Sequence, residues 1–148
     1  MMTPFLPRMT PLSGADPALR AALESESLPV DDLGDEGRVF FVFHDDQGAL
    51  MGFGGLEQHG ALALMRSVVV VPERRGQGLG TALLSALLDH ARALGCRDAY
   101  LLTTTAVALG RRCGFRFLPR DEAPGVIRAS RQMASLCPAS AVLMTRSL

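Results

Sequence analysis

A valine-rich run that leads through three glycines into an amphipathic helix constrains the fold of this sequence more than any other feature. Residues 61–71 are apolar enough for a strand covered on both faces, and we expect this strand to lie centrally in a sheet. After the turn at residues 75–80, leucine and alanine recur at helical spacing from Leu79 to Leu94, and Gly95 suits the C-terminal cap. The sequence therefore predicts a buried strand that passes directly into a long helix.

The glycine-rich turn indicates an anion-binding site. Glycine lets the backbone approach an anion without interference from a Cβ, and a helix N-terminus favours negative charge. A phosphate or pyrophosphate is therefore the expected ligand. A P-loop needs Gly-Lys-Ser/Thr, but the chain has no lysine; a dinucleotide-binding loop needs G-x-G-x-x-G, but Gly76, Gly78 and Gly80 are spaced G-x-G-x-G. A turn without any ligand is the remaining alternative, although each unneeded glycine in a first helical turn costs about 1 kcal/mol.

The other segments predict further strands and helices around this unit. Asp16 followed by Pro17 begins a helix that ends by Pro29. The β-branched and aromatic run at residues 38–44 is followed by a turn and a second strand at residues 49–57, which predicts a hairpin. Further along we expect a strand at 99–103, a short helix at 105–113, a strand at 114–118, a helix at 121–136 that stops before Pro138, and a strand at 139–146. This succession predicts a mixed sheet of the α+β or α/β class.

The bulk composition narrows the class of protein. With 148 residues and 48% apolar composition, we expect residues 1–148 to form a single domain. The formal charge is zero and no long basic run occurs, so nucleic acid is not an expected partner. No signal-peptide pattern and no run of about 18 apolar residues is found, which favours a cytoplasmic protein that does not enter the membrane. Cys96, Cys113 and Cys137 form no C-x-x-C pair, so their spacing predicts no disulfide framework and no zinc site, and it gives no support for a direct arsenite site, which stays open.

The turn and two later motifs resemble one enzyme family. Residues 70–80 are similar to the acetyl-CoA signature Arg/Gln-x-x-Gly-x-Gly/Ala of the GNAT acetyltransferases. Residues 103–106, followed by Gly114 and Phe115, resemble the family segment Asn-x-x-Ala…Gly-Phe at the same spacing, and the order of elements agrees over nearly the whole chain. The resemblance implies an α/β fold with a central mixed sheet, a V-shaped splay and helices on both faces. It also implies acetyl-CoA as the co-substrate, with no metal.

The resemblance assigns cofactor contacts by position. The pyrophosphate would lie on the amides after Arg75, the pantetheine arm would pair with the preceding strand, and the motif at residues 103–106 would complete the site. A backbone N–H near Val70 would stabilise the oxyanion, a contribution of typically about 3 kcal/mol. The residues so assigned are Val68, Val69, Val70, Arg75, Gly76, Gln77, Gly78, Leu79, Gly80, Thr81, Thr103 and Thr105.

The same resemblance bears on the base that deprotonates the attacking amine. Glu57 is the first candidate, because the superfamily often places a carboxylate at the end of the strand preceding residues 61–71. A surface glutamate beside a turn is the alternative interpretation. His44 and His59 lie in or near turns and are interpreted as solvated loop residues.

The usual proton donor of the family is missing. Many GNAT enzymes carry a tyrosine four residues before the glycine of the Gly-Phe pair, and this chain has Gly110 there. Its one tyrosine, Tyr100, falls on a predicted strand. Ser67 or Thr104 is therefore a candidate proton relay, with unaided departure of the thiolate and purely structural hydroxyl groups as the alternatives.

A narrower resemblance concerns the acceptor. Residues 64–68, 100–106 and 130–141 are similar to the arsenic-resistance N-acetyltransferases, which implies a small amino-acid-like organoarsenical or a related toxic amine as substrate. Guanidinium groups form bidentate hydrogen bonds with carboxylate or arsonate oxygens. Three arginines are therefore candidates for binding an anionic group of that substrate: Arg66, Arg128 and Arg131. The alternative is that these arginines lie solvated at the surface.

The sequence therefore predicts an N-acetyltransferase that acts on a small-molecule amine. Two other functions stay open: Gly110 is compatible with a non-catalytic acyl-CoA-binding or sensor domain, and nothing specifies or excludes protein N-acetylation. Whether the chain forms a homodimer also stays open.

Overall fold

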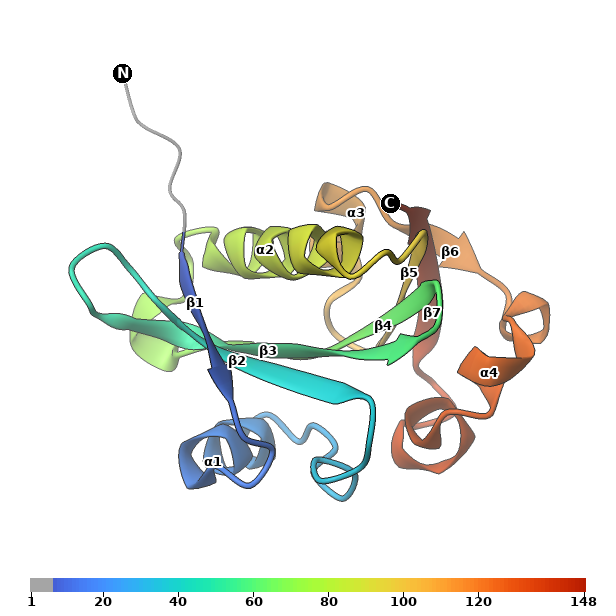
Figure 1. Ribbon diagram of the computed structural model, residues 1–148, viewed down its shortest axis with the longest axis horizontal. Helices are drawn as coiled ribbons and strands as arrows, with labels where there is room; N and C mark the ends of the chain where they lie inside the picture. The colour runs from blue at the N-terminus through green and yellow to red at the C-terminus, as the bar shows by residue number, and fades with distance from the viewer. Residues whose placement is uncertain (1–6) are drawn as a thin grey trace.

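The fold is a seven-stranded mixed sheet with helices on both faces, seen in a computed structural model that describes residues 7–148 (Figure 1). The strand order is β1-β2-β3-β4-β5-β7-β6, and within residues 7–148 only the pair β4 and β5 is parallel. The strands are β1 (Arg8–Leu12), β2 (Arg38–His44), β3 (Leu50–His59), β4 (Leu62–Val70), β5 (Asp98–Thr103), β6 (Arg116–Leu118) and β7 (Val142–Ser147). The helices are α1 (Pro17–Ser25), α2 (Leu79–Ala93), α3 (Val107–Arg112) and α4 (Gly125–Arg128), with short helices η1 (Pro72–Arg74), η2 (Arg120–Glu122) and η3 (Gln132–Leu136).

The first half of the chain forms as its sequence predicts, apart from one added strand. Asp16 caps α1, since its Oδ1 accepts hydrogen bonds from the backbone N–H groups of Ala18 and Leu19, 2.9 and 3.1 Å away. The predicted hairpin is β2 and β3. Strand β1 was not expected because Pro11 interrupts a short, mostly exposed segment; proline is tolerated there since β1 lies at the edge of the sheet.

Strand β4 is central and covered on both faces, as predicted. Ala63 and Met65 pack in the cluster beneath α2, whereas Leu64 belongs to a second cluster on the opposite face. The parallel pairing with β5 runs from Leu62 to Met65 only. Beyond Met65 the two strands separate, which gives the sheet its splay.

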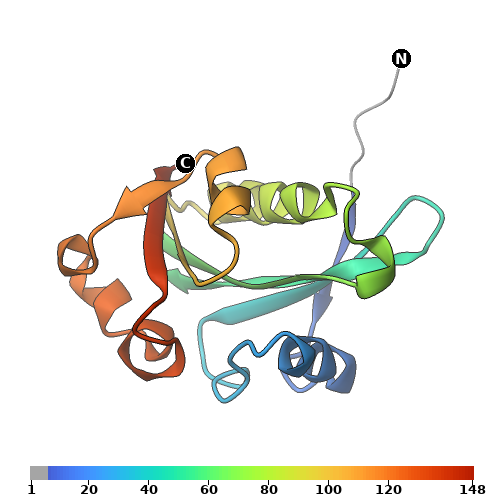
Figure 2. The same cartoon turned by 180° about the vertical axis from the view of Figure 1, so that it is seen from behind.

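Both faces of the sheet carry a core. Helices α2 and α3 cover one face, and α1 and α4 lie on the other (Figures 1 and 2). The α2 side holds the largest cluster, which includes Phe43, Leu84 and Leu87. On the opposite side one cluster packs α1 on β2, β3 and β4 through Leu19 and Leu23, and another packs the C-terminal segment on β5 and β7.

The prediction of one continuous helix at residues 121–136 was wrong. The chain forms η2, α4 and the π-helical turn η3 instead. Pro124 is the cause of the first break, since the residue before a proline avoids helical angles and Ala123 is extended at φ −66° and ψ 144°. The predicted stop before Pro138 is confirmed, because Cys137 is extended at φ −90° and ψ 145°.

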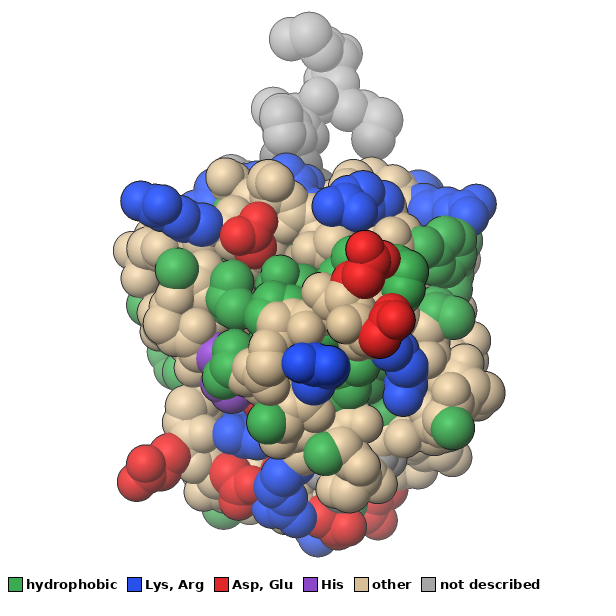
Figure 3. Space-filling view, turned by 90° about the vertical axis from the view of Figure 1, so that its right-hand side faces the viewer, with side chains coloured by type: hydrophobic (Ala, Val, Ile, Leu, Met, Phe, Trp, Pro, Cys, Tyr) green, Lys and Arg blue, Asp and Glu red, His purple; other side chains and the backbone are tan. Residues whose placement is uncertain are grey.

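The surface over β6 and α4 mixes apolar side chains with charges of both signs (Figure 3). Phe117 and Val126 are the most exposed large apolar residues here, each 45% accessible. The Arg111 guanidinium lies over the Phe117 ring at 4.8 Å from its centroid. None of the helices between residues 7 and 148 has the length and apolar character needed to span a bilayer.

Candidate functional site

A cavity of 540 Å³ lies where β4 and β5 separate. Residues 65–70 of β4 form one wall, and residues 101–103 of β5, with the turn into α3, form the other. The end of α1 and the segment at residues 132–137 also contribute. Six of the residues assigned to the cofactor line this cavity: Val68, Val69, Val70, Arg75, Thr103 and Thr105.

The glycine turn adjoins the cavity and has the geometry of an anion cradle. Gly76 and Gly78 have φ values of 82° and 74°, a left-handed conformation that favours glycine. Gly78 is the N-cap of α2 and offers no side chain to its first turn, so the amides of Leu79, Gly80 and Thr81 have no partner among residues 7–148. These N–H groups, with the helix dipole, suit a pyrophosphate.

Two arginines flank this helix end. Arg75 donates from Nε to the carbonyl of Val70 at 3.2 Å, and its Nη2 is ion-paired with Glu26 at the end of α1. Arg112, on α3, donates from Nε to the Thr81 hydroxyl at 3.5 Å and also lines the cavity. Both guanidinium groups lie where phosphate charge is expected.

The hairpin between β2 and β3 braces the turn from outside. The Asp45 carboxylate accepts hydrogen bonds from the Gln47 and Ala49 amides, and it pairs with Arg74 at 3.0 Å. The Ala49 bond, followed by the Arg74 and Gln47 bonds, lowers the pKa of Asp45 below its usual value against the effect of burial. Arg74 in turn donates to the side chain of Gln77, so Asp45 holds the turn through Arg74.

A β-bulge in β4 places Ser67 in the cavity wall. Gly55 pairs with Arg66 and Phe53 with Val69, so Gly54 alone faces the two residues Ser67 and Val68. Ser67 has a φ of 62°, a left-handed conformation that is uncommon for a residue other than glycine. Such strained positions concentrate at functional sites.

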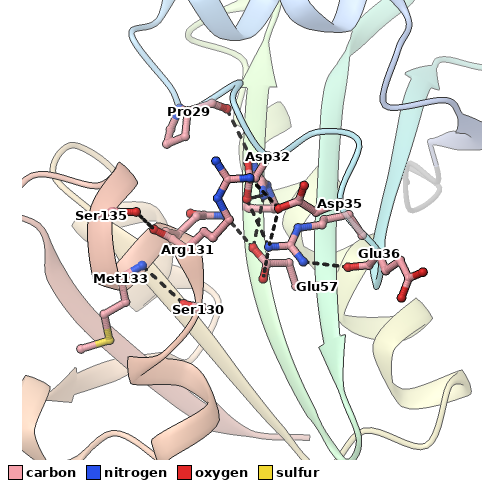
Figure 4. A network of polar contacts seen from close by, with 12 residues as sticks. Pro29, Asp32, Asp35, Glu36, Glu57, Ser130, Arg131, Met133 and Ser135 are labelled. Atoms are coloured by element: carbon pink, nitrogen blue, oxygen red, sulfur yellow. Dashed lines mark hydrogen bonds and ion pairs between the residues drawn. The ribbon is translucent and has the colours of Figure 1, made fainter.

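Arg66, the residue before the bulge, is buried in an ion-pair network. Figure 4 shows this network around the carboxylates of Asp32 and Glu57. Arg66 Nη1 and Nη2 contact the Asp32 carboxylate at 2.5 and 2.8 Å, and Nη1 also contacts Glu57 at 3.2 Å. Arg38 supplies a second guanidinium, 3.4 Å from Asp32 and 3.3 Å from Glu57. Burial raises the pKa of Asp32, but the hydrogen bonds and charges of Arg66 and Arg38 outweigh it and hold the pKa below its usual value.

Glu57, the expected base, lies inside this network and not in the cavity wall. Its side chain is fully buried. Besides the two arginines, its carboxylate is bonded to the Gln132 amide at 3.1 Å and contacts His59 Nε2 at 3.2 Å. His59 is therefore half-buried against a carboxylate, whereas the sequence indicated a solvated loop residue.

The C-terminal segment closes the cavity at the same end. Gln132 is buried, donates to Glu57 through Nε2, and accepts a hydrogen bond from the Cys137 thiol at 3.7 Å through Oε1. Burial raises the pKa of the Cys137 thiol, so it is protonated at neutral pH and is a poor nucleophile. Arg131 pairs with Asp35 at 2.7 Å, and neither it nor Arg128 is part of the cavity lining.

The position of the missing tyrosine is filled by the core. A Cβ on Gly110 would lie 2.9 Å from the Met144 sulfur and 3.2 Å from Leu101 Cδ2. Thr103, at the asparagine position of the family motif, accepts hydrogen bonds from the Thr105 and Ala106 amides at 3.2 and 2.8 Å and so shapes the turn into α3. Thr104, the other predicted relay, is not part of the cavity lining.

Several site residues were missed by sequence reasoning. Glu26, Asp32 and Gln132 lie in segments without a motif, and each meets its partner across 34 to 75 residues of sequence. Arg112 could have been predicted as a site residue. It lies six residues after Ala106 of the recognised motif, in the last turn of the short helix that was predicted there.

Comparison with known proteins defines the class of the enzyme. The family model described as Acetyltransferase (GNAT) family matches residues 9–115, and the chain belongs to this family. It is an acyl-CoA-dependent N-acetyltransferase, and acetyl-CoA is its co-substrate. No curated protein sequence matches the chain significantly.

Solved structures agree with this assignment. A Klebsiella pneumoniae protein assigned as an acyl-CoA N-acyltransferase is 26% identical, with a TM-score of 0.73 over 96% of this chain and 97% of that one. N-acetylglutamate synthase from Neisseria gonorrhoeae, solved with coenzyme A and N-acetyl-glutamate, is 20% identical with a TM-score of 0.74; the match covers 99% of this chain but 36% of that one. A Bacillus subtilis acetyltransferase solved with CoA is 16% identical, with a TM-score of 0.69 over 96% and 99% of the two chains. The last two show the shared fold.

Proposed function

We propose that this enzyme transfers the acetyl group of acetyl-CoA to the amine of a small molecule. The 540 Å³ cavity carries the proposal, because it begins beside the glycine turn and ends at a polar wall formed by Arg66, Ser67 and Gln132. The open edge of β4 offers backbone groups for the pantetheine arm, and the splay leaves room for the thioester. A cavity of this size has room for a small acceptor beside the arm.

The acceptor is best described by what the wall can bind. Arg66 has no N–H group left for a substrate, since all five donate to protein oxygens. Arg128 and Arg131 lie outside the cavity lining, and Arg131 is paired with Asp35, so none of the three predicted arginines is placed to bind an acceptor in the cavity that carries a carboxylate or arsonate. The acceptor class inferred from the arsenic-resistance likeness, a small amino-acid-like organoarsenical or a related toxic amine, includes such compounds.

Glu57 acts as the base in this proposal only through a bridging water, because its carboxylate does not reach the cavity. The Glu57→Gln variant tests this role. Loss of kcat with unchanged acetyl-CoA affinity and a changed pH profile of kcat/KM supports it. An unchanged pH profile, with lower thermal stability alone, contradicts it.

The experiment for the function itself is an amine panel. Purified enzyme is incubated with acetyl-CoA and single amines, including amino acids, amino-acid-like arsonates and phosphinates, and short peptides. Release of the free CoA thiol and the mass of the acetylated product are measured. We expect at least one small amine to yield both, and peptides to yield neither; binding of CoA without turnover on any amine contradicts the proposal.

That contradictory result would favour a non-catalytic acyl-CoA-binding or sensor domain. One observation supports this second candidate: the position of the family tyrosine is Gly110, and its space is filled by Met144 and Leu101. Thiol release distinguishes the two candidates: both predict the same acetyl-CoA affinity in the parent and in the Glu57→Gln variant, but the sensor domain releases no thiol from either.

A further inference from the structure

Ser67 combines three properties that a proton-transferring residue needs. It lines the cavity at the point where β4 leaves β5, so it lies beside the space available to the thioester. It is held in a left-handed conformation at a β-bulge, which fixes its backbone. Its Oγ accepts a hydrogen bond from Arg66 Nε at 3.0 Å, and among residues 7–148 no group accepts the hydroxyl hydrogen. That hydrogen therefore stays free to be donated into the cavity.

Arg66 is fixed in the orientation that this hydrogen bond requires. Its five N–H groups are matched by five acceptors: the Ser67 hydroxyl, the Pro29 carbonyl, two oxygens of Asp32 and one of Glu57. Its guanidinium also lies over the Phe40 ring, 5.4 Å from the centroid. Because two buried carboxylates hold the guanidinium, Nε points at Ser67 and cannot turn toward a substrate.

No tyrosine competes for this role. Gly110 occupies the place of the usual donor, and Met144 leaves no room for a side chain there. Tyr100 is buried on β5 against the C-terminal segment, and its pKa is raised by burial and by Asp98. Cys137 lines the cavity, but its thiol is already bonded to Gln132.

We propose that Ser67 shuttles a proton from the attacking amine to the leaving sulfur, and that Arg66 is the positioning residue that holds its hydroxyl for this step. The amine nitrogen forms a bond to the acetyl carbon, and the carbon–sulfur bond breaks with both electrons going to sulfur. The amine loses its first proton before attack, through the water that leads to Glu57; Ser67 Oγ takes the second proton, which the nitrogen loses after attack, while its own proton moves to sulfur. The products are the amide and the free CoA thiol, and Ser67 ends unchanged. The shuttle rests on the proposed acetyl transfer and explains how that transfer proceeds without the tyrosine.

The Ser67→Gly variant tests the shuttle, with Ser27→Gly as its matched control. Ser27 is the other non-glycine residue with positive φ among residues 7–148, at 55°, and it does not line the cavity. Glycine relieves the same strain at both positions, but Ser67→Gly also removes the acceptor of the buried Arg66 Nε donor, so its Tm should lie below that of Ser27→Gly. We expect kcat on acetyl-CoA to fall about 10²- to 10⁴-fold in Ser67→Gly and to stay unchanged in Ser27→Gly. Equal kcat values in the two variants would overturn the shuttle.

A series of S-aryl thioacetates separates proton donation from a structural role. Thiolates of low pKa leave without a proton, so the ratio of parent to Ser67→Gly rates should approach one as the pKa of the leaving thiol falls. A constant ratio across the series would contradict donation by Ser67. Arg66→Lys keeps the positive charge but removes the Nε donor, and it should show the same dependence on the leaving group with unchanged CoA affinity. If Arg66→Lys does not fold, the comparison of Ser67→Gly with Ser27→Gly still tests the shuttle.

The wild-type enzyme is measured first, so that two failures can be told apart. Absence of wild-type turnover on every amine contradicts the proposed function. Normal wild-type turnover that Ser67→Gly retains contradicts only the shuttle.

Discussion

Gly78→Val is the perturbation that addresses the cofactor site alone. A Cβ at this position meets nothing within 4 Å, so there is space for the start of a side chain. Gly78 has a φ of 74°, however, and this left-handed conformation costs other residues about 1–2 kcal/mol. The turn then changes its backbone angles and moves the amides at the start of α2. Each amide bond to a charged group contributes about 1.5–3 kcal/mol, so loss of one lowers acetyl-CoA affinity roughly 10- to 150-fold.

Gly95→Val is the matched control at the other end of α2. Gly95 has a φ of 90°, and a Cβ there also meets nothing within 4 Å. Both variants should therefore lower the free energy of unfolding by a similar amount. Each kcal/mol lost should lower Tm by about 2–4 °C. Calorimetric titration with acetyl-CoA should show weaker binding for Gly78→Val only. Equal affinities in the two variants would refute our placement of the pyrophosphate.

Three further variants probe the residues around the cavity. Glu26→Gln frees Arg75 to bind phosphate and should strengthen acetyl-CoA binding by up to about fivefold in calorimetry, because an exposed ion pair contributes about 0.2–1 kcal/mol. The control Glu24→Gln removes an ion pair with Arg20 instead and should leave the affinity unchanged. The pKa of Asp32 is lower in the folded than in the unfolded protein, so ionised Asp32 stabilises the fold above the unfolded pKa of about 3.9, and this stabilisation is lost as pH falls through the folded pKa. In urea unfolding, Asp32→Asn should remove this pH dependence and lower the free energy of unfolding by about 3 kcal/mol or more at pH 7. Gly110→Tyr should lower the free energy of unfolding by about 1–3 kcal/mol without raising kcat, since its Cβ would meet Met144; a faster enzyme would contradict the assignment of Ser67.

The fold was predictable where local pattern and tertiary environment agree. The run at residues 61–71, the glycine turn and α2 are each consistent with one structure at every level, and all three were predicted. The single helix predicted at residues 121–136 was wrong, because Pro124 keeps Ala123 out of the helical conformation, just as Pro138 does for Cys137. Strand β1 has no pattern of its own and forms because β2 offers an edge.

The candidate site was predictable only in its cofactor half. Glycine spacing reports backbone geometry directly, so the left-handed turn at Gly76 and Gly78, where we propose that the pyrophosphate binds, could be predicted from sequence. The acceptor half depends on side chains brought together by the fold. Asp32 and Arg66 are 34 residues apart, and nothing local shows that Arg66 uses all its donors within the protein instead of on a substrate. Likewise, no spacing rule shows that Glu57 is separated from the cavity.

A crystal structure of the enzyme with CoA tests the central claim most directly. We predict that the pyrophosphate lies on the amides of Leu79, Gly80 and Thr81 and that the pantetheine arm runs along β4. The thiol sulfur should then lie within hydrogen-bonding distance of Ser67 Oγ. A sulfur atom placed away from Ser67, or a pyrophosphate bound elsewhere than the N-terminus of α2, would contradict the account.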